Sequence, residues 1–228
     1  MFPVFTGIHN ILGKTADDPD ILRYITATPG FFTVWNLVLH QVYFGCCCLS
    51  HVSHAFPKLV PRLLVFVANV VRRNIFNSIL VPSSMMTAVN FWGMKSISPA
   101  AVYSDMVSAF PQWINHSLHT FVVPISLAEL FLRGSAGEAM DFGSRKGWMM
   151  INGYVTIYTA STAAHFLSTG TWVYPFYDSM NNWMKAGVPV FMYGSAGLYY
   201  FAAKRLGKIF WGKHGVMKQA APLMAKLK

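Results

Sequence analysis

Threonine and histidine side chains stand inside otherwise apolar stretches of the chain, where they could do chemistry. Thr33, Asn36 and His40 are separated by three and four residues, so a helix would carry them on one face. His116 and His119 stand in a second such stretch, in the sequence INHSLHT. An imidazole that removes the proton of a hydroxyl makes that hydroxyl a nucleophile, provided that the two groups come within hydrogen-bond reach. These residue types therefore indicate attack by a hydroxyl with an imidazole as base.

Motifs typical of other chemistries are missing from the sequence. No HExxH motif and no paired Cys and His spacing indicates zinc, and no glycine-rich loop indicates phosphate binding. GSAG at 194–197 is one residue shorter than a G-x-S-x-G nucleophile elbow and favours a helix-packing surface. The three cysteines are adjacent, at 46–48, so they cannot link distant segments. We therefore expect no metal and no cofactor.

The elements that must position these residues follow from the composition. Of the 228 residues, 54% are hydrophobic and only 11% are charged, whereas a soluble domain carries about 25% charged residues. This disfavours a soluble enzyme, and the high hydrophobicity also disfavours intrinsic disorder. The net charge of +10 could indicate nucleic-acid binding, but the cations lie between apolar blocks, which is typical of a membrane protein. We expect a bilayer as partner and no nucleic acid.

Five apolar stretches approach or reach the roughly 20 residues that cross a bilayer core. A sixth stretch of about 13 residues contains Arg62 and favours an interfacial or re-entrant segment. Because no strand alternation is present, the sequence predicts an all-α fold, a polytopic membrane helical bundle of about five transmembrane helices. The expected spans are 33–50, 74–94, 113–132, 148–168 and 186–203, with the interfacial segment at 59–71.

The charges predict three regions and an orientation. Residues 1–32 are expected to form an interfacial or disordered lead, 33–205 the transmembrane bundle and 206–228 a basic tail. With five spans, 14 of the 18 lysines and arginines lie on the side of the tail. The positive-inside rule then predicts a cytoplasmic C-terminus and a lumenal or external N-terminus. We expect a multi-pass protein of the endoplasmic reticulum, another endomembrane or the plasma membrane.

This topology brings polar residues to the lumenal end of the bundle. Thr33 opens the first span there, His116 and His119 enter with the third, and His165 lies near the lumenal end of the fourth. Polar groups at membrane depth are costly, so they are candidates for function. A membrane threonine also commonly bonds to a backbone carbonyl of its own helix, and a histidine can bridge helices. At this point both interpretations stay open.

Three short motifs in a consistent order resemble those of the androgen-induced protein family. The first is FTVWNLVL at 32–39 with VYFG at 42–45, the second is PQWINHSLHT at 111–120, and the third is WVYPF at 172–176. The resemblance extends over most of the chain, from Phe31 to the fifth expected helix.

The resemblance implies a multi-pass membrane hydrolase that cleaves fatty acid esters of hydroxy fatty acids with a membrane-embedded Thr and His. The threonine of the family falls on Thr33, and its histidine falls on His119, the second histidine of N-H-x-x-H. The family usually carries a further hydrophobic segment before the threonine motif, whereas the 32 residues at the start of this sequence contain no full span.

The leading hypothesis is therefore an ester hydrolase. His119 would act as general base on the Thr33 hydroxyl, which would attack a lipid ester entering from the bilayer. The alternative is a non-enzymatic membrane regulator or lipid-sensing scaffold, in which the same residues only bridge helices. A transporter is a third possibility, without support from repeat symmetry. The candidates for stabilising the oxyanion or lining the pocket are Asn36, Asn115, His116 and His165.

Overall fold

The computed structural model describes residues 27–97, 112–135 and 145–211. Within these ranges every regular element is a helix, which confirms the all-α class. Most of the expected lead and most of the expected basic tail lie outside the described residues. The elements are η1 (Thr28–Gly30), α3 (Phe32–Ala55), α4 (Arg62–Ile75), η2 (Phe76–Leu80), α5 (Val81–Ile97), α8 (Gln112–His119), α9 (Val122–Ser135), α10 (Arg145–Thr169), η3 (Pro175–Ser179) and α11 (Asn182–Trp211).

The segments expected separately at 59–71 and 74–94 join into one helix. α4, η2 and α5 form a continuous helix of 36 residues from Arg62 to Ile97, in which η2 is a π-helical turn. Pro82 is the second residue after this turn. Proline has no N–H for the carbonyl four residues earlier and its ring crowds that carbonyl, so a wider turn relieves the clash without ending the helix.

The expected third span is instead broken into α8 and α9. The Phe121 N–H donates to the His116 carbonyl at 2.9 Å, five residues back, and the Val123 N–H donates to the Thr120 carbonyl at 3.2 Å. Pro124 explains the break, because it cannot donate to the Thr120 carbonyl as the next helical residue would. The break follows His119 directly, so this histidine ends a helix rather than standing in the middle of one.

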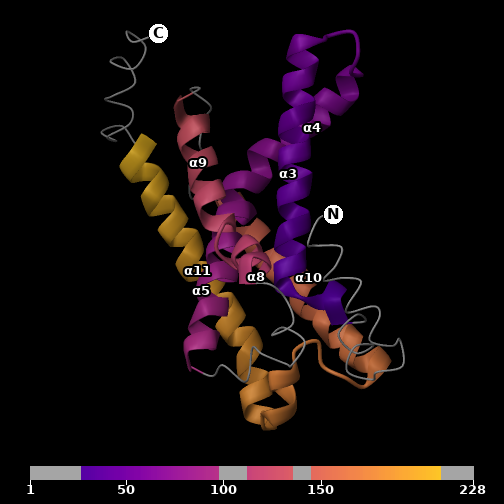
Figure 1. Cartoon of the computed structure of the whole chain (residues 1–228), viewed down its shortest axis with the longest axis vertical. Coiled ribbons are helices and arrows are strands. Elements are labelled where there is room, and N and C mark those ends of the chain that lie inside the picture. The colour runs from indigo at the N-terminus through magenta and orange to yellow at the C-terminus, as the bar shows by residue number, and fades with distance from the viewer. Residues whose placement is uncertain (1–26, 98–111, 136–144, 212–228) are drawn as a thin grey trace.

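The long helices alternate in direction. In Figure 1, α3, α9 and α11 end in the upper part of the view, whereas α5 and α10 end in the lower part. Among the described residues, two helices are long and apolar enough to cross a membrane, Phe32–Ala55 and Arg62–Ile97. The topology of about five spans stays a prediction.

Two buried apolar clusters hold the helices together. Met86 and Tyr200 belong to one, which joins α3, η2, α5, α10 and α11. Tyr43 and Leu130 belong to the other, which joins α3, η2, α5, α9 and α11. Residues 195–197 of the GSAG run are buried, which confirms the packing surface predicted there. The first cluster adjoins the start of α3, where Thr33 lies.

Candidate active site

Thr33 and His119 meet at the junction of α3 and α8. Thr33 is the second residue of α3 and His119 the last residue of α8. Although 86 residues separate them in the chain, Thr33 Oγ1 lies 3.0 Å from His119 Nε2. The structure thus brings together the two residues that the sequence singled out, at the distance that proton transfer between them requires.

The second nitrogen of His119 defines which tautomer the site holds. His119 Nδ1 lies 3.0 Å from the backbone carbonyl oxygen of Asn115. A carbonyl can only accept a hydrogen bond, so Nδ1 carries the proton and Nε2 is left as an acceptor for the Thr33 hydroxyl. The Phe91 ring stacks on the imidazole with 3.5 Å between ring centroids and 9° between planes. A neutral imidazole held in this way has the orientation and the tautomer that a general base acting on Thr33 would need.

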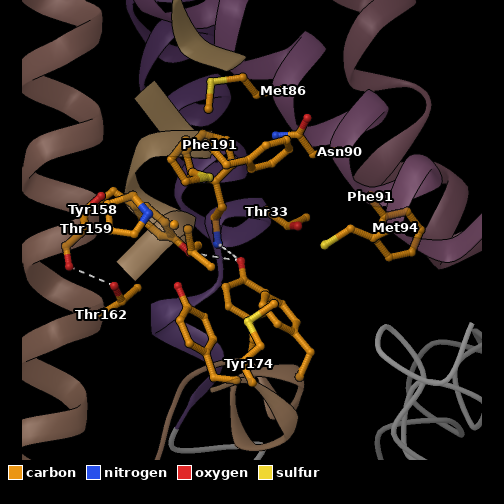
Figure 2. A pocket seen from close by; sticks show the side chains of 18 of the residues that line it. Thr33, Met86, Asn90, Phe91, Met94, Tyr158, Thr159, Thr162, Tyr174 and Phe191 are labelled. Carbon is orange, nitrogen blue, oxygen red and sulfur yellow. Dashed lines mark hydrogen bonds between the residues drawn. The ribbon is translucent and has the colours of Figure 1, made fainter. Parts of the chain in front are cut away.

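Thr33 also lies on the wall of a cavity of about 420 Å³. Figure 2 shows Thr33 among the side chains that line it, with Met86 and Tyr174 toward opposite ends of the view. The volume falls in the range of small-molecule sites, and a mainly apolar wall with a few polar groups is typical of them. The wall comes from α3, α5, α10, α11 and the segment around η3, and its methionines are Met86, Met94, Met180, Met184 and Met192.

The Tyr174 hydroxyl is hydrogen-bonded to the first turn of α3, next to Thr33. Its hydroxyl oxygen accepts hydrogen bonds from the Phe32 backbone N–H at 2.9 Å and from the Tyr158 hydroxyl at 3.0 Å. The first amides of a helix have no partner within the helix, so this contact satisfies one of them. Burial raises the pKa of Tyr174, which keeps its phenol protonated. The WVYPF motif therefore positions the residue adjacent to Thr33.

Asn36 and Asn115 lie beside the pair but do not line the cavity. Asn36, one turn beyond Thr33 on α3, is fully buried, and its Oδ1 accepts a hydrogen bond from Ser83 Oγ at 2.8 Å. Its Nδ2 has no hydrogen-bond partner among the described residues. Asn115 is also buried, and its backbone carbonyl orients His119.

His116 and His165 are not brought into the site. His116 Nδ1 lies 3.0 Å from Thr120 Oγ1, and its ring stacks on Trp92 with 5.1 Å between centroids. His165 is half-buried on α10. Neither histidine lines the cavity, so the structure offers no support for assigning them to its wall.

Thr87 is a cavity residue that the sequence analysis missed. It lies on α5, is only 4% exposed and lines the same cavity as Thr33. Its hydroxyl has no hydrogen-bond partner among the described residues. The available signal was the recurrence of hydroxyl side chains at Ser83, Ser84 and Thr87, whose three- and four-residue intervals share one helix face.

Comparison with known proteins assigns the family. The FAR-17a/AIG1-like protein family matches residues 29–208, and the chain belongs to this family, which confirms the resemblance seen in the motifs. The androgen-dependent TFPI-regulating protein of Mus musculus is 28% identical over 180 residues, which cover 76% of this chain and 74% of that protein. Its Homo sapiens counterpart is 27% identical over 204 residues, covering 88% and 84%. The Homo sapiens androgen-induced gene 1 protein is 25% identical over 199 residues, covering 83% and 80%. No solved structure matches the chain.

Proposed function

We propose that the protein is a membrane-embedded hydrolase of lipid carboxylic esters, with Thr33 as nucleophile and His119 as general base. The observation that carries the proposal is the 3.0 Å contact between Thr33 Oγ1 and His119 Nε2 beside a cavity that Thr33 lines. Thr33 has no other side-chain hydrogen bond among the described residues. Its proton is therefore directed to the imidazole rather than to a carbonyl of its own helix, where membrane threonines commonly bond.

The proposed reaction proceeds in two steps. His119 Nε2 takes the Thr33 proton while Thr33 Oγ1 forms a bond to the ester carbonyl carbon, and the carbonyl π electrons move to oxygen. When the carbonyl re-forms, the alkoxide of the hydroxy acid leaves with the proton held by His119. Water then attacks the acyl-threonine in the same way, with His119 again as base, and releases the fatty acid and the free Thr33 hydroxyl.

The substrate class that we propose is a fatty acid ester of a hydroxy fatty acid. The methionine and aromatic side chains on the cavity wall suit acyl chains, and methionine adapts to irregular apolar shapes. The volume of about 420 Å³ suits a drug-sized ligand rather than an entire two-chain lipid. We infer that one chain and the ester occupy the cavity while the other chain extends into the bilayer.

We further propose a multi-pass arrangement with the C-terminus in the cytoplasm, in the endoplasmic reticulum, another endomembrane or the plasma membrane. The support is the alternating direction of the long helices together with the 14 of 18 cations on one side of a five-span topology. A C-terminal tag should be digested by protease added to sealed microsomes. A protected C-terminal tag would contradict this orientation.

A second candidate function is a non-enzymatic membrane regulator or lipid-sensing scaffold. The observation that favours it is the name of the Mus musculus relative, androgen-dependent TFPI-regulating protein, which describes regulation of TFPI rather than a reaction. In such a protein the Thr33–His119 hydrogen bond would only join two helices.

The experiment that separates the two functions is activity-based labelling of membranes with a fluorophosphonate probe, alongside hydrolysis of a branched fatty acid ester. We expect the probe on Thr33, located by mass spectrometry, and labelling should disappear in Thr33→Val. A wild-type protein that is folded in the membrane but neither labelled at Thr33 nor able to hydrolyse the ester would contradict the hydrolase and favour the scaffold.

A further inference from the structure

The unpartnered hydroxyl of Thr87 stands out among the threonines of the cavity wall. Thr159 Oγ1 donates to the Val155 carbonyl at 2.8 Å, and Thr162 Oγ1 donates to the Thr159 carbonyl at 2.8 Å. Such bonds to the preceding turn are the usual way in which a hydroxyl is satisfied inside a helix. Thr87 is more than nine-tenths buried and makes no such bond within the described part of the chain. A buried, unpaired hydroxyl is costly, and this one belongs to a residue that lines the cavity.

The pairing of α3 with α5 places Thr87 beside the nucleophile. One turn before Thr87, Ser83 donates to the Asn36 side chain, one turn beyond Thr33. One turn after Thr87, Phe91 stacks on His119, which contacts Thr33. The contacts before and after Thr87 thus both lead to the immediate surroundings of Thr33, and Thr33 and Thr87 line the same cavity.

The proposed reaction creates a need for a hydrogen-bond donor at this place. When Thr33 attacks, the carbonyl oxygen of the ester becomes an anion, and donors aimed at that oxygen supply much of the catalysis in acyl transfer. His119 cannot serve, because its Nδ1 proton is bonded to the Asn115 carbonyl and its Nε2 receives the Thr33 proton. Thr33 lies in the first turn of α3, where the positive end of the helix dipole favours a nearby negative charge.

We propose that Thr87 is a further catalytic residue, whose hydroxyl donates a hydrogen bond to the oxyanion formed by attack of Thr33. The inference rests on the proposed hydrolase function and adds a residue to it. Asn36 Nδ2 is also buried without a partner among the described residues, but Asn36 does not line the cavity, so a substrate carbonyl there would not reach it. Thr87 combines an unused donor with a place on the cavity wall; its hydroxyl is covered in the structure, and rotation of the side chain about χ1 would turn it toward the substrate.

The test compares Thr87→Val, Thr87→Ser and Thr162→Val in purified protein with a branched fatty acid ester. Thr87→Val keeps the shape and removes the donor, and we expect kcat to fall about 100-fold or more with little change in KM, as when one oxyanion donor is removed elsewhere. Thr87→Ser keeps the hydroxyl and should retain activity within about tenfold. Thr162→Val is the matched control, because Thr162 lines the same cavity. We expect it to change kcat/KM at most a few-fold, through a change in KM and not in kcat.

A stability measurement excludes a merely structural role. Because Thr87 loses no hydrogen bond to the described residues when it becomes valine, Thr87→Val should melt at or above the wild-type temperature in detergent. Lower melting together with a parallel loss of active protein would overturn the proposal, as would wild-type kcat in Thr87→Val. If hydrolysis depends on Thr33 and Thr87→Val is unaffected, only this inference fails. If the wild-type protein shows no Thr33-dependent hydrolysis, the proposed function and this inference fail together.

Discussion

Among the described residues, His119 and His40 have the same local geometry and both face hydroxyl groups, but only the hydroxyl-bearing partner of His119, Thr33, lines the cavity. His119 Nδ1 bonds to the carbonyl oxygen four residues earlier, at Asn115, and His40 Nδ1 bonds to the carbonyl oxygen four residues earlier, at Asn36, at 2.8 Å. In both, Nε2 faces hydroxyl groups: His119 faces Thr33 at 3.0 Å, whereas His40 faces two serines, each at 3.3 Å. The local helix geometry therefore produces the same tautomer twice.

The difference lies in the hydroxyls. Around His40 they belong to Ser84 and Ser126, which donate to the carbonyls of Leu80 at 2.7 Å and Val122 at 2.8 Å. A hydroxyl has one proton, so a serine that is bonded to its own helix has none left for the imidazole. Both serines are fully buried and neither lines the cavity. We infer that the cluster of His40, Ser84 and Ser126 joins α3, α5 and α9, whereas the Thr33–His119 pair is arranged for chemistry.

The largest expected effect is the loss of the Thr33 hydroxyl. Thr33→Val should lower ester hydrolysis at least about a thousandfold, because it removes the nucleophile and keeps the side-chain shape. Thr33→Ser should retain measurable activity, since it keeps the hydroxyl. The measurement is the hydrolysis rate per folded protein in membranes. Full activity in Thr33→Val would refute the nucleophile assignment.

The second-largest expected loss of hydrolysis is that of His119→Ala, and His116→Ala is its control. Loss of a general base lowers the rate by about 10²–10⁴, and the double variant with Thr33→Val should be little worse than either single one, because residues that act as a unit fail together. His116 bonds to Thr120 and stacks on Trp92, so His116→Ala should reduce activity only as far as it reduces folded protein. Equal, partial losses at both histidines that follow expression would favour the scaffold.

Tyr174→Phe should have an intermediate effect. The substitution removes the acceptor for the Phe32 N–H and the Tyr158 hydroxyl, and each such hydrogen bond contributes about 1 kcal/mol. The start of α3 should loosen, and we expect hydrolysis to fall about tenfold, since small displacements of a reacting group lower the rate sharply. Kinetics should show the loss in kcat rather than in KM. An unchanged kcat would show that Tyr174 does not position Thr33.

The sequence predicted some features because they depend on local pattern. Long apolar stretches predicted helices, and the motif resemblance with the topology pointed to Thr33 and His119. Features that depend on how helices pair were out of reach: the hydroxyl pattern around Thr87 was visible, but its place beside α3 and the stacking of Phe91 on His119 follow from how α5 packs against α3 and α8. His116 illustrates the same limit, because nearness to His119 in the chain did not bring it to Thr33; it contacts Thr120 and Trp92 instead.

Helix interruptions form a second group of missed features, although their signals were present. Pro82 and Pro124 both stand inside expected spans, and each accompanies a different departure from a regular helix. At Pro82 the helix continues through the π-helical turn η2, whereas near Pro124 it is interrupted at residues 120–121. Sequence alone does not decide between these outcomes, because the neighbouring helices determine which one packs better.

The smallest expected effect on hydrolysis is that of Ser126→Ala, which tests the cluster around His40 directly. The substitution removes one hydroxyl facing His40 Nε2 and leaves Ser84 at 3.3 Å. It also removes the hydrogen bond from the Ser126 hydroxyl to the Val122 carbonyl in α9. Because a neutral hydrogen bond contributes about 1 kcal/mol, the free energy of unfolding should fall by about that amount. Melting in detergent should fall by a few degrees, while hydrolysis per folded protein should stay within about twofold because the cluster does not contact the cavity. A large loss of hydrolysis in well-folded Ser126→Ala would mean that the His40 cluster takes part in the reaction, and the distinction between the two histidines would fail.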